Sequence, residues 1–203
     1  MNWQLFTAFL LITLVLMLIP GPIVTLVITT SASKGMRAGF VTIAGTSSGS
    51  AVLLTVIAVG LGWILNHALT WFEILRWVGA AYLVWLGVQA WRGADRAEPL
   101  PPNDRIHFGR GFLVALSNPK TIAFFTAFLP QFVDPSLPVA RQLAVMCGVS
   151  VLLATVTDSG WAILAGLGRI WFMQPARAKL LGRLSGLTLI GGGLWLSLSR
   201  RPV

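Results

Sequence analysis

Residues 5–30 read LFTAFLLITLVLMLIPGPIVTLVITT and contain no charged side chain. A helix that crosses a bilayer needs about 20 mainly apolar residues, so this stretch is long enough to span one. The rest of the chain has a similar character, since 56% of its 203 residues are hydrophobic and only 10% are charged. An ordinary globular domain has roughly 25% charged residues, and a small one cannot hide so much apolar surface from water. The sequence therefore predicts an integral membrane protein.

Apolar stretches of similar length recur along the chain and predict six transmembrane helices. They are Leu5–Thr30, Gly39–Leu65, Ile74–Trp91, Phe112–Val133, Gln142–Leu167 and Leu180–Leu198. The predicted fold is an all-α polytopic membrane protein with one transmembrane domain over residues 1–203. Its halves, about 1–92 and 111–203, are joined by a cytoplasmic loop at 93–110. Three spans in each half would run in opposite directions, an arrangement that allows two inverted repeats, as in many transporters.

Positive charge is concentrated in the gaps between the apolar stretches. The net charge of +9 would indicate nucleic-acid binding in a soluble protein, but here it indicates membrane topology, because basic residues are retained on the cytoplasmic side. With the N-terminus outside, the inner gaps hold Lys34, Arg37, Arg92, Arg96, Arg105, Arg110, Arg169, Arg177, Lys179 and Arg183. The outer side holds a smaller set: Arg76, Arg141, Arg200 and Arg201. This distribution predicts that both termini are outside.

Residues that could hold a metal or cofactor are scarce. Cys147 is the only cysteine, and His67 and His107 lie in different gaps between spans. We expect no disulfide within the chain, no zinc or haem site and no other cofactor. The sequence has no phosphate-binding loop of the Walker type, so the chain itself is not expected to hydrolyse ATP.

The first span is interrupted by Pro20-Gly21-Pro22. Each proline lacks an N–H and its ring clashes with a carbonyl one turn earlier, so the helix should break or kink here, and the glycine allows close approach. Broken backbone at membrane depth needs surrounding protein or a water-filled cavity to satisfy it. The motif is compatible with a packing kink or with the wall of a cavity, and two prolines around a glycine favour the cavity.

The fourth span contains Asn118-Pro119-Lys120. A lysine inside the hydrocarbon layer costs about 3 kcal/mol and normally faces protein or water. One interpretation is that Lys120 reaches the cytoplasmic surface along its flexible stem. The other is a ligand site, because Asn118 adds an amide and Pro119 frees a backbone carbonyl beside the ammonium group.

Asp158, in the fifth span, is the only carboxylate well inside any predicted helix. Small residues share its face at intervals of four: Ser150, Ala154, Ala162 and Gly166. This spacing predicts a groove with the carboxylate near its middle. A carboxylate at membrane depth is a candidate proton, ion or ligand site. The alternative interpretation is a structural ion pair with Lys120.

The three features are predicted to lie at one depth. Counting about 1.5 Å per helical residue from the predicted span ends places Pro22, Lys120 and Asp158 each roughly 12–14 Å from the inner surface, which predicts a single site. In the second span, Thr46 belongs to a row of hydroxyl residues beside Gly45-x-x-x-Gly49, a motif for close helix packing. Close packing and a hydroxyl-lined wall are both compatible with this row, and Thr46 is a candidate site residue for the second.

Taken together, the motifs resemble those of the LysE/RhtB family of bacterial amino-acid exporters over nearly the whole chain. Beside the two proline motifs, the resemblance rests on Gly109-x-Gly111 and on Leu129-Pro130-Gln131-Phe132. It implies efflux of amino acids or close derivatives across the bacterial inner membrane, driven by exchange with protons. The family's motif residues carry over as Pro20, Gly21, Pro22, Asn118, Pro119 and Lys120. Asp158 is a candidate on physical grounds alone.

Two other classes of protein are alternatives to a secondary transporter. An intramembrane enzyme would need a histidine inside a span or a second buried carboxylate, and the predicted spans contain neither. A structural membrane subunit without a substrate would tolerate the loss of charge at Lys120 and Asp158. The expected partners are an amino-acid-like small molecule, protons and the lipid bilayer, with no nucleic acid, and the sequence leaves a homo-oligomer open.

Overall fold

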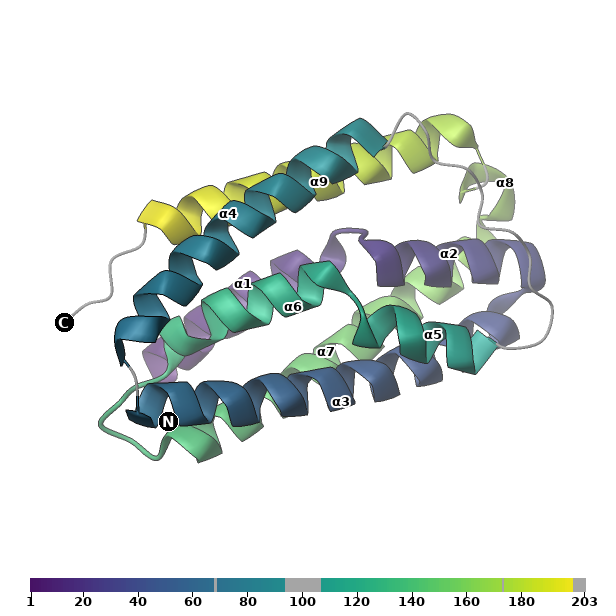
Figure 1. Cartoon of the computed structure of the whole chain (residues 1–203). Helices are drawn as coiled ribbons and strands as arrows, with labels where there is room; N and C mark the ends of the chain where they lie inside the picture. Colours follow the sequence, from purple (N-terminus) through teal and green to yellow (C-terminus); the bar gives the residue numbers. More distant parts are fainter. Residues whose placement is uncertain (68, 94–106, 173, 199–203) are drawn as a thin grey trace.

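The computed structural model describes residues 1–67, 69–93, 107–172 and 174–198, and this part of the chain is helical apart from short connections (Figure 1). No β-strand occurs within it. The elements are α1 (Trp3–Leu18), α2 (Pro22–Lys34), α3 (Met36–His67), α4 (Leu69–Gly93), α5 (His107–Leu116), α6 (Pro119–Phe128), the 3₁₀ helix η2 (Leu129–Phe132), α7 (Val139–Leu167), α8 (Arg169–Phe172) and α9 (Pro175–Leu198). The predicted all-α fold class is confirmed.

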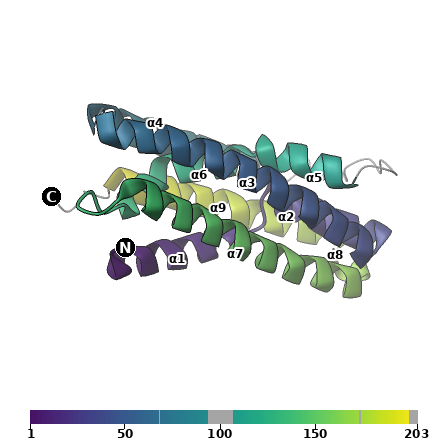
Figure 2. The ribbon, with the colours of Figure 1, turned by 90° about the horizontal axis from the view of Figure 1, so that it is seen from below.

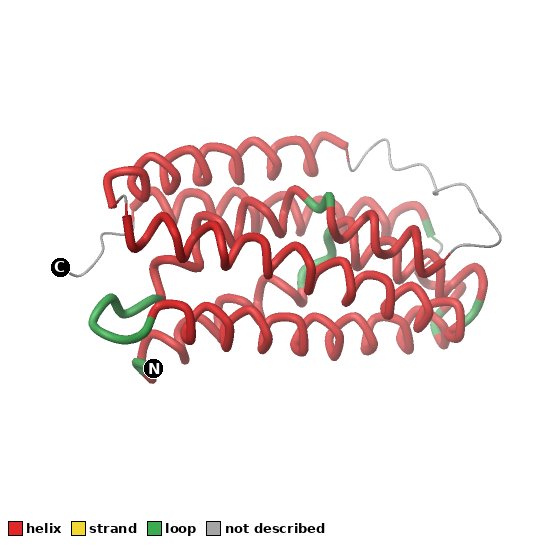
Figure 3. The backbone as a smooth tube through the Cα atoms, turned by 60° about the horizontal axis from the view of Figure 1, so that its bottom comes forward, coloured by secondary structure: helices red, strands yellow, loops and turns green. Residues whose placement is uncertain are grey.

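The long helices lie side by side along roughly one direction and form an elongated bundle (Figure 1, Figure 2). The start of α1, the end of α3, the start of α4, the loop before α7 and the end of α9 gather at one end, which we call the N-terminal end of the bundle. The junction of α2 with α3, the start of α5 and the short helix α8 gather at the opposite end (Figure 1). Figure 3 shows the connections between helices as loops. The first helix therefore begins at the end of the bundle where the last described helix finishes.

Three helical segments are long and apolar enough to cross a membrane. They are Met36–Trp63, His107–Phe132 and Val139–Leu167, and the bent pair Trp3–Leu18 with Pro22–Lys34 is a fourth if it counts as one span. These spans are those found among the described residues only. The count of six spans and the inverted repeats stay predictions.

Several helices begin earlier than the apolar stretches that predicted them. Helix α5 starts at His107, so His107–Arg110, which were predicted to end a loop, form its first turn. Residues 94–106 of that predicted loop lie outside the described part of the chain. Helix α9 likewise starts at Pro175 and not at Leu180. Apolar stretches stop at charged residues, whereas a helix can continue while its lysine and arginine side chains extend toward polar surroundings.

The first and fourth predicted spans are each divided into two helices. Helices α1 and α2 meet at 45° around Pro20-Gly21, and α5 and α6 are separated by Ser117-Asn118. Pro22 and Pro119 each occupy the first turn of the following helix, where a missing N–H costs nothing. The predicted break at the Pro-Gly-Pro motif is confirmed, and the fourth span breaks in a comparable way.

Helices α3 and α5 pack closely because small residues line their contact. A Cβ atom at Gly45 would overlap the main-chain carbonyl of Phe108, and one at Gly111 would overlap the carbonyl of Thr42. Thr46 is fully buried on α3, and its hydroxyl donates to the carbonyl of Ile43 at 3.1 Å. Thr46 and Gly45 therefore take part in close helix packing and do not form a hydroxyl-lined wall.

The small face of α7 receives helices α2 and α3. Ala162 is fully buried in a cluster with Val27 and Ile43, and a Cβ atom at Gly166 would overlap the side chain of Met36. The predicted groove therefore exists, and toward the opposite end of the bundle it is filled by neighbouring helices. Asp158 lies one turn before Ala162 on the same face.

Aromatic side chains fill the bundle toward its N-terminal end. Phe9 of α1 packs edge-to-face against Phe132 of η2, with ring centroids 5.6 Å apart. Both belong to one core cluster with Leu129, Leu143 and Met146, and all five side chains are buried. This cluster closes the bundle between the N-terminal end and the breaks in the helices.

We predict opposite effects for two glycine substitutions in α3. Gly45→Ala should destabilise the folded protein by about 1–3 kcal/mol, because the new methyl group meets backbone that cannot move aside easily. Gly60→Ala is the matched control, because a Cβ atom there would have nothing within 4 Å, and it should leave the melting temperature unchanged or raise it through better helix propensity. Thermal melting of both purified variants, followed by size-exclusion chromatography, measures the difference. Equal melting temperatures would contradict the close α3–α5 contact.

Candidate functional site

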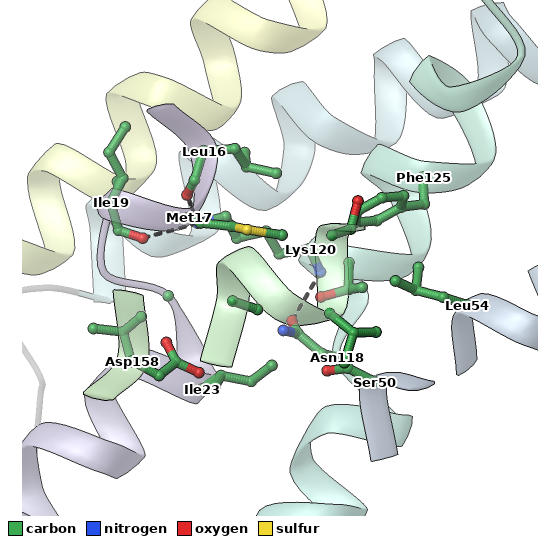
Figure 4. A pocket seen from close by; sticks show the side chains of 16 residues that line it. Leu16, Met17, Ile19, Ile23, Ser50, Leu54, Asn118, Lys120, Phe125 and Asp158 are labelled. Carbon is green, nitrogen blue, oxygen red and sulfur yellow. Dashed lines mark hydrogen bonds between the residues drawn. The ribbon is translucent and has the colours of Figure 1, made fainter. Parts of the chain in front are cut away.

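A cavity of about 70 Å³ lies where the two divided spans meet α3 and α7. Its wall contains Gly21, Asn118, Lys120 and Asp158 (Figure 4). This volume is large enough for several water molecules. Of the three residues that were predicted to lie at one depth, Lys120 of α6 and Asp158 of α7 line this one cavity, while Pro22 is represented there by its neighbours Gly21 and Ile23.

The Lys120 ammonium group is the strongest polar feature of the cavity. Its Nζ donates to the main-chain carbonyl oxygens of Leu16 and Ile19, at 2.9 Å each. In a continuous helix the Leu16 carbonyl would accept from the N–H of residue 20, but that residue is proline. Lys120 is only 8% exposed, so the interpretation that it extends to the cytoplasmic surface is wrong. It satisfies backbone carbonyls that the helix break has freed.

Gly21 makes room for the lysine side chain. A Cβ atom at this position would lie 3.0 Å from Cδ and 3.4 Å from Nζ of Lys120. The backbone of Gly21 is extended, with φ −123°, which any residue can adopt. The reason for glycine here is therefore space for Lys120 and not an unusual backbone conformation.

Two helices begin at the cavity. Helix α2 starts after Gly21 and has no side-chain cap, and helix α6 starts after Asn118, whose Oδ1 accepts from the main-chain N–H of Lys120 at 3.1 Å. The first N–H groups of a helix carry partial positive charge and need acceptors. Together with the Lys120 ammonium, these two helix starts make one side of the cavity electropositive.

Asp158 supplies the negative charge of the cavity. Its side chain is 5% exposed and extends from α7 toward the junction of α1 with α2 (Figure 4). Among the described residues, its carboxylate has neither a hydrogen bond nor an ion pair within 4.0 Å. Asp158 and Lys120 therefore do not form a direct ion pair. Their charges interact only across the cavity.

The remaining wall is apolar, with three hydroxyl groups. The hydroxyl residues are Ser50, Thr121 and Ser150, and the apolar ones are Leu16, Met17, Ile19, Ile23, Val24, Leu54, Phe125, Val151 and Ala154. Apolar walls strengthen the interactions of the few polar groups among them, because water competes less for those groups.

Some predicted site residues lie outside the cavity wall. Pro20, Pro22 and Pro119 shape the breaks but do not line the cavity, and Thr46 is buried between α3 and α5. Ser50 and Ser150 line the cavity but were not predicted as site residues, although both belong to the rows of four-residue spacing in the sequence. The carbonyls of Leu16 and Ile19 could not be predicted either, since every residue has a backbone carbonyl whatever its side chain.

The described residues contain no group of three or more histidine, cysteine, aspartate or glutamate side chains that could hold a metal ion. Cys147 is buried on α7, where its thiol contacts the carbonyl of Leu54 at 3.6 Å. The chemistry available in the cavity is therefore that of one ammonium group, two helix starts, one carboxylate and a few hydroxyls. Such a set can bind a molecule that carries one negative and one positive group.

Comparison with known proteins identifies similar chains. The family model described as "LysE type translocator" matches residues 14–200. A homoserine/homoserine lactone efflux protein of Salmonella typhimurium is 34% identical to this chain, with 97% of this chain and 98% of the relative covered.

Two further relatives have less specific names. An uncharacterized membrane protein of Vibrio cholerae is 32% identical, with 98% of this chain and 100% of the relative covered. Another, from Pseudomonas aeruginosa, is also 32% identical, with 90% and 88% covered. No solved structure matches the chain significantly.

Proposed function

The chain belongs to the LysE type translocator family, and from that premise we propose that it exports small, neutral amino acids or their close derivatives across the bacterial inner membrane. Membership supports transport as the activity, and the relatives' names describe efflux and membrane location. The observation that carries the proposal is the separation of charge in the cavity. Lys120 and two helix starts lie on one side, and the carboxylate of Asp158, which is unpaired among the described residues, faces the same space.

An amino acid in water carries a carboxylate and an ammonium group. In our proposal, Lys120 and the first N–H groups of α2 and α6 receive the carboxylate, as helix starts do for anions at discontinuous membrane helices. Asp158 receives the ammonium group, which gives a reason for a buried carboxylate that has no partner in the described part of the chain.

The wall of the cavity favours a substrate with a short, uncharged side chain. Asp158 is the only acidic residue among those that line it, so once the substrate's ammonium is bound no second carboxylate is left for a basic side chain. The hydroxyls of Ser50 and Ser150 can bind a polar group on an otherwise apolar side chain. Homoserine, one of the two compounds in the name of the Salmonella relative, has this chemistry and is the first to test. Homoserine lactone, the other, keeps the ammonium group but has an ester in place of the carboxylate and hydroxyl, so the carboxylate contacts predict that it binds less tightly.

We propose that Asp158 couples export to proton entry. A bound ammonium group favours the ionised carboxylate, because opposite charges attract strongly in apolar surroundings. When the substrate leaves, a carboxylate in the same surroundings is favoured as the neutral acid, so a proton replaces the ammonium group. Export of one molecule would then be coupled to entry of one proton through a single side chain.

The membrane arrangement in this proposal has six spans. They are the divided pairs α1/α2 and α5/α6 together with α3, α4, α7 and α9. The two divided spans each open one half of the chain, as expected for inverted repeats. The basic residues predicted to be cytoplasmic, such as Lys34 and Arg169, lie at the end of the bundle opposite the N-terminus, which supports both termini outside.

Loss of the carboxylate at position 158 should separate export from exchange. Asp158→Asn keeps the shape of the side chain and removes its titration, so export driven by a pH gradient should fall to the level of vesicles without the protein. Exchange of labelled for unlabelled substrate should persist, with weaker binding, if the carboxylate acts mainly in proton coupling. Proteoliposomes loaded in turn with homoserine, homoserine lactone, leucine and lysine provide the measurement, and lysine should be exported least.

Asp134→Asn is the matched control for Asp158→Asn. The Asp134 carboxylate accepts hydrogen bonds from Asn2 and Ser136 at the N-terminal end of the bundle, outside the cavity, and export should stay at the wild-type rate. Normal gradient-driven export by Asp158→Asn at normal abundance would show that the carboxylate is structural. No export of any compound by the wild-type chain would contradict the proposed function itself.

Two near-isosteric substitutions test the orientation. In a Cys147→Ala background, Ser136→Cys should react with a membrane-impermeant maleimide in intact cells, because its loop is proposed to lie outside. Ser33→Cys should react only after the membrane is permeabilised. Both positions are exposed. The reverse labelling pattern would place both termini in the cytoplasm.

A further inference from the structure

The hydrogen bonds of Lys120 join two segments that are far apart in the chain. The lysine belongs to the first turn of α6, while its acceptors, Leu16 and Ile19, lie at the end of α1, 104 and 101 residues away. Both are charge-assisted hydrogen bonds in buried surroundings, a type that is stronger than a bond between neutral groups. Lys120 therefore holds the end of α1 against the cavity.

Apart from these hydrogen bonds, the end of α1 is held by apolar packing alone, through Leu16 and Met17 against the core cluster. One of its faces is turned away from the protein, with Leu11, Val15 and Leu18 each about half exposed or more, and its packing is mainly against α7 and η2. The opposite face carries Phe9, Thr13 and Met17 at intervals of four residues. Phe9 packs on Phe132, and Met17 lines the cavity. This face of α1 thus separates the cavity from the N-terminal end of the bundle.

We propose that Lys120 is a switch that holds α1 closed over the empty cavity, and that the carboxylate of an arriving substrate takes over its ammonium group and releases α1. The substrate part rests on the proposed function, because it needs a carboxylate in the cavity. The tether does not, because it concerns Lys120 and the α1 carbonyls alone.

The substrate carboxylate and the α1 carbonyls compete for the ammonium group of Lys120, and the carboxylate is the stronger acceptor. A carboxylate oxygen is a better acceptor for an ammonium group than a main-chain carbonyl, because it carries charge. While Lys120 is bound to α1, two of its donors are occupied, so a carboxylate binds more tightly to the form in which α1 has been released. A ligand shifts a conformational equilibrium only through such a difference in affinity. Substrate binding therefore favours the released form of α1.

Thr13 offers a reporter for the position of α1. Its side chain is 0% exposed, and its hydroxyl is buried without a hydrogen-bond partner in the described part of the chain. Thr13→Cys is close in size and removes no hydrogen bond. A thiol at this position should react slowly with a small polar methanethiosulfonate while α1 is closed and quickly once α1 is released.

The tether is tested without substrate, in lipid nanodiscs that expose both ends of the protein. In a Thr13→Cys, Cys147→Ala background, Lys120→Gln should raise the labelling rate at least about tenfold, because the charge-assisted bonds to α1 are lost. Lys120→Arg keeps several donors and should stay within about threefold of the parent rate. Lys179→Gln, which removes a lysine from α9, is the matched control and should leave the rate unchanged. Labelling of monodisperse Lys120→Gln protein at the parent rate would overturn the inference.

The substrate part is tested with Lys120 present. Saturating homoserine should accelerate the labelling of the thiol introduced by Thr13→Cys, whereas 3-aminopropan-1-ol, which has the same amine and hydroxyl groups but no carboxylate, should not. Equal acceleration by both compounds, or no acceleration by homoserine that is shown to bind, would overturn the release by a carboxylate. Failure of every compound to bind would contradict the proposed function, while the labelling rate of Lys120→Gln would still decide the tether.

A second variant covers the case in which Lys120→Gln does not fold. Gly21→Ala places a methyl group 3.0 Å from Cδ and 3.4 Å from Nζ of Lys120, so the lysine side chain must give by a few tenths of an ångström, which we expect to weaken its bonds to the carbonyls. In the same Thr13→Cys background, the introduced thiol should be labelled faster than in the parent protein. The increase should be smaller than the one predicted for Lys120→Gln. A rate equal to that of the parent would overturn the tether.

Discussion

The constraint on which the site depends is the need to satisfy backbone carbonyls inside an apolar bundle. Pro20 removes the N–H that would have bonded to the Leu16 carbonyl, and the chain leaves helical geometry at Ile19. Freed carbonyls among apolar side chains need a hydrogen-bond donor. Lys120 provides it with hydrogen bonds of 2.9 Å to both carbonyls. The helix break at Pro20 therefore determines where the Lys120 ammonium group lies, and the cavity lies beside that group.

The same arrangement explains why the other motif residues lie where they do. Gly21 leaves space for the lysine side chain, and Asn118 caps the helix that carries it. Close packing of α3 on α5 and of α2 on α7 seals the bundle toward the opposite end, and the aromatic cluster around Phe9 seals it toward the N-terminal end. Asp158 then faces a small enclosed space in which a second charge has large effects on binding and on protonation.

Much of this could be predicted from the sequence, and the failures have physical causes. The helix break, the small face of α7 and the convergence of Lys120 and Asp158 follow from proline chemistry and helical spacing. Thr46 and Ser50 have the same spacing, yet Thr46 is buried against α5 and Ser50 lines the cavity. Steps of four residues rotate by about 40° around a helix, so successive members of such a row face different neighbours. The acceptors of Lys120 could not be predicted, because spacing within one helix says nothing about contacts across 104 residues.

The most direct test of the central claim is a cryo-electron microscopy structure of the protein with homoserine bound. We predict that the ligand lies in this cavity with its ammonium group beside Asp158 and its carboxylate bonded to Nζ of Lys120, which has left the carbonyls of Leu16 and Ile19. A ligand bound elsewhere would contradict the claim. So would a ligand in the cavity while Lys120 keeps both hydrogen bonds to α1, because the cation would then serve the helix break alone.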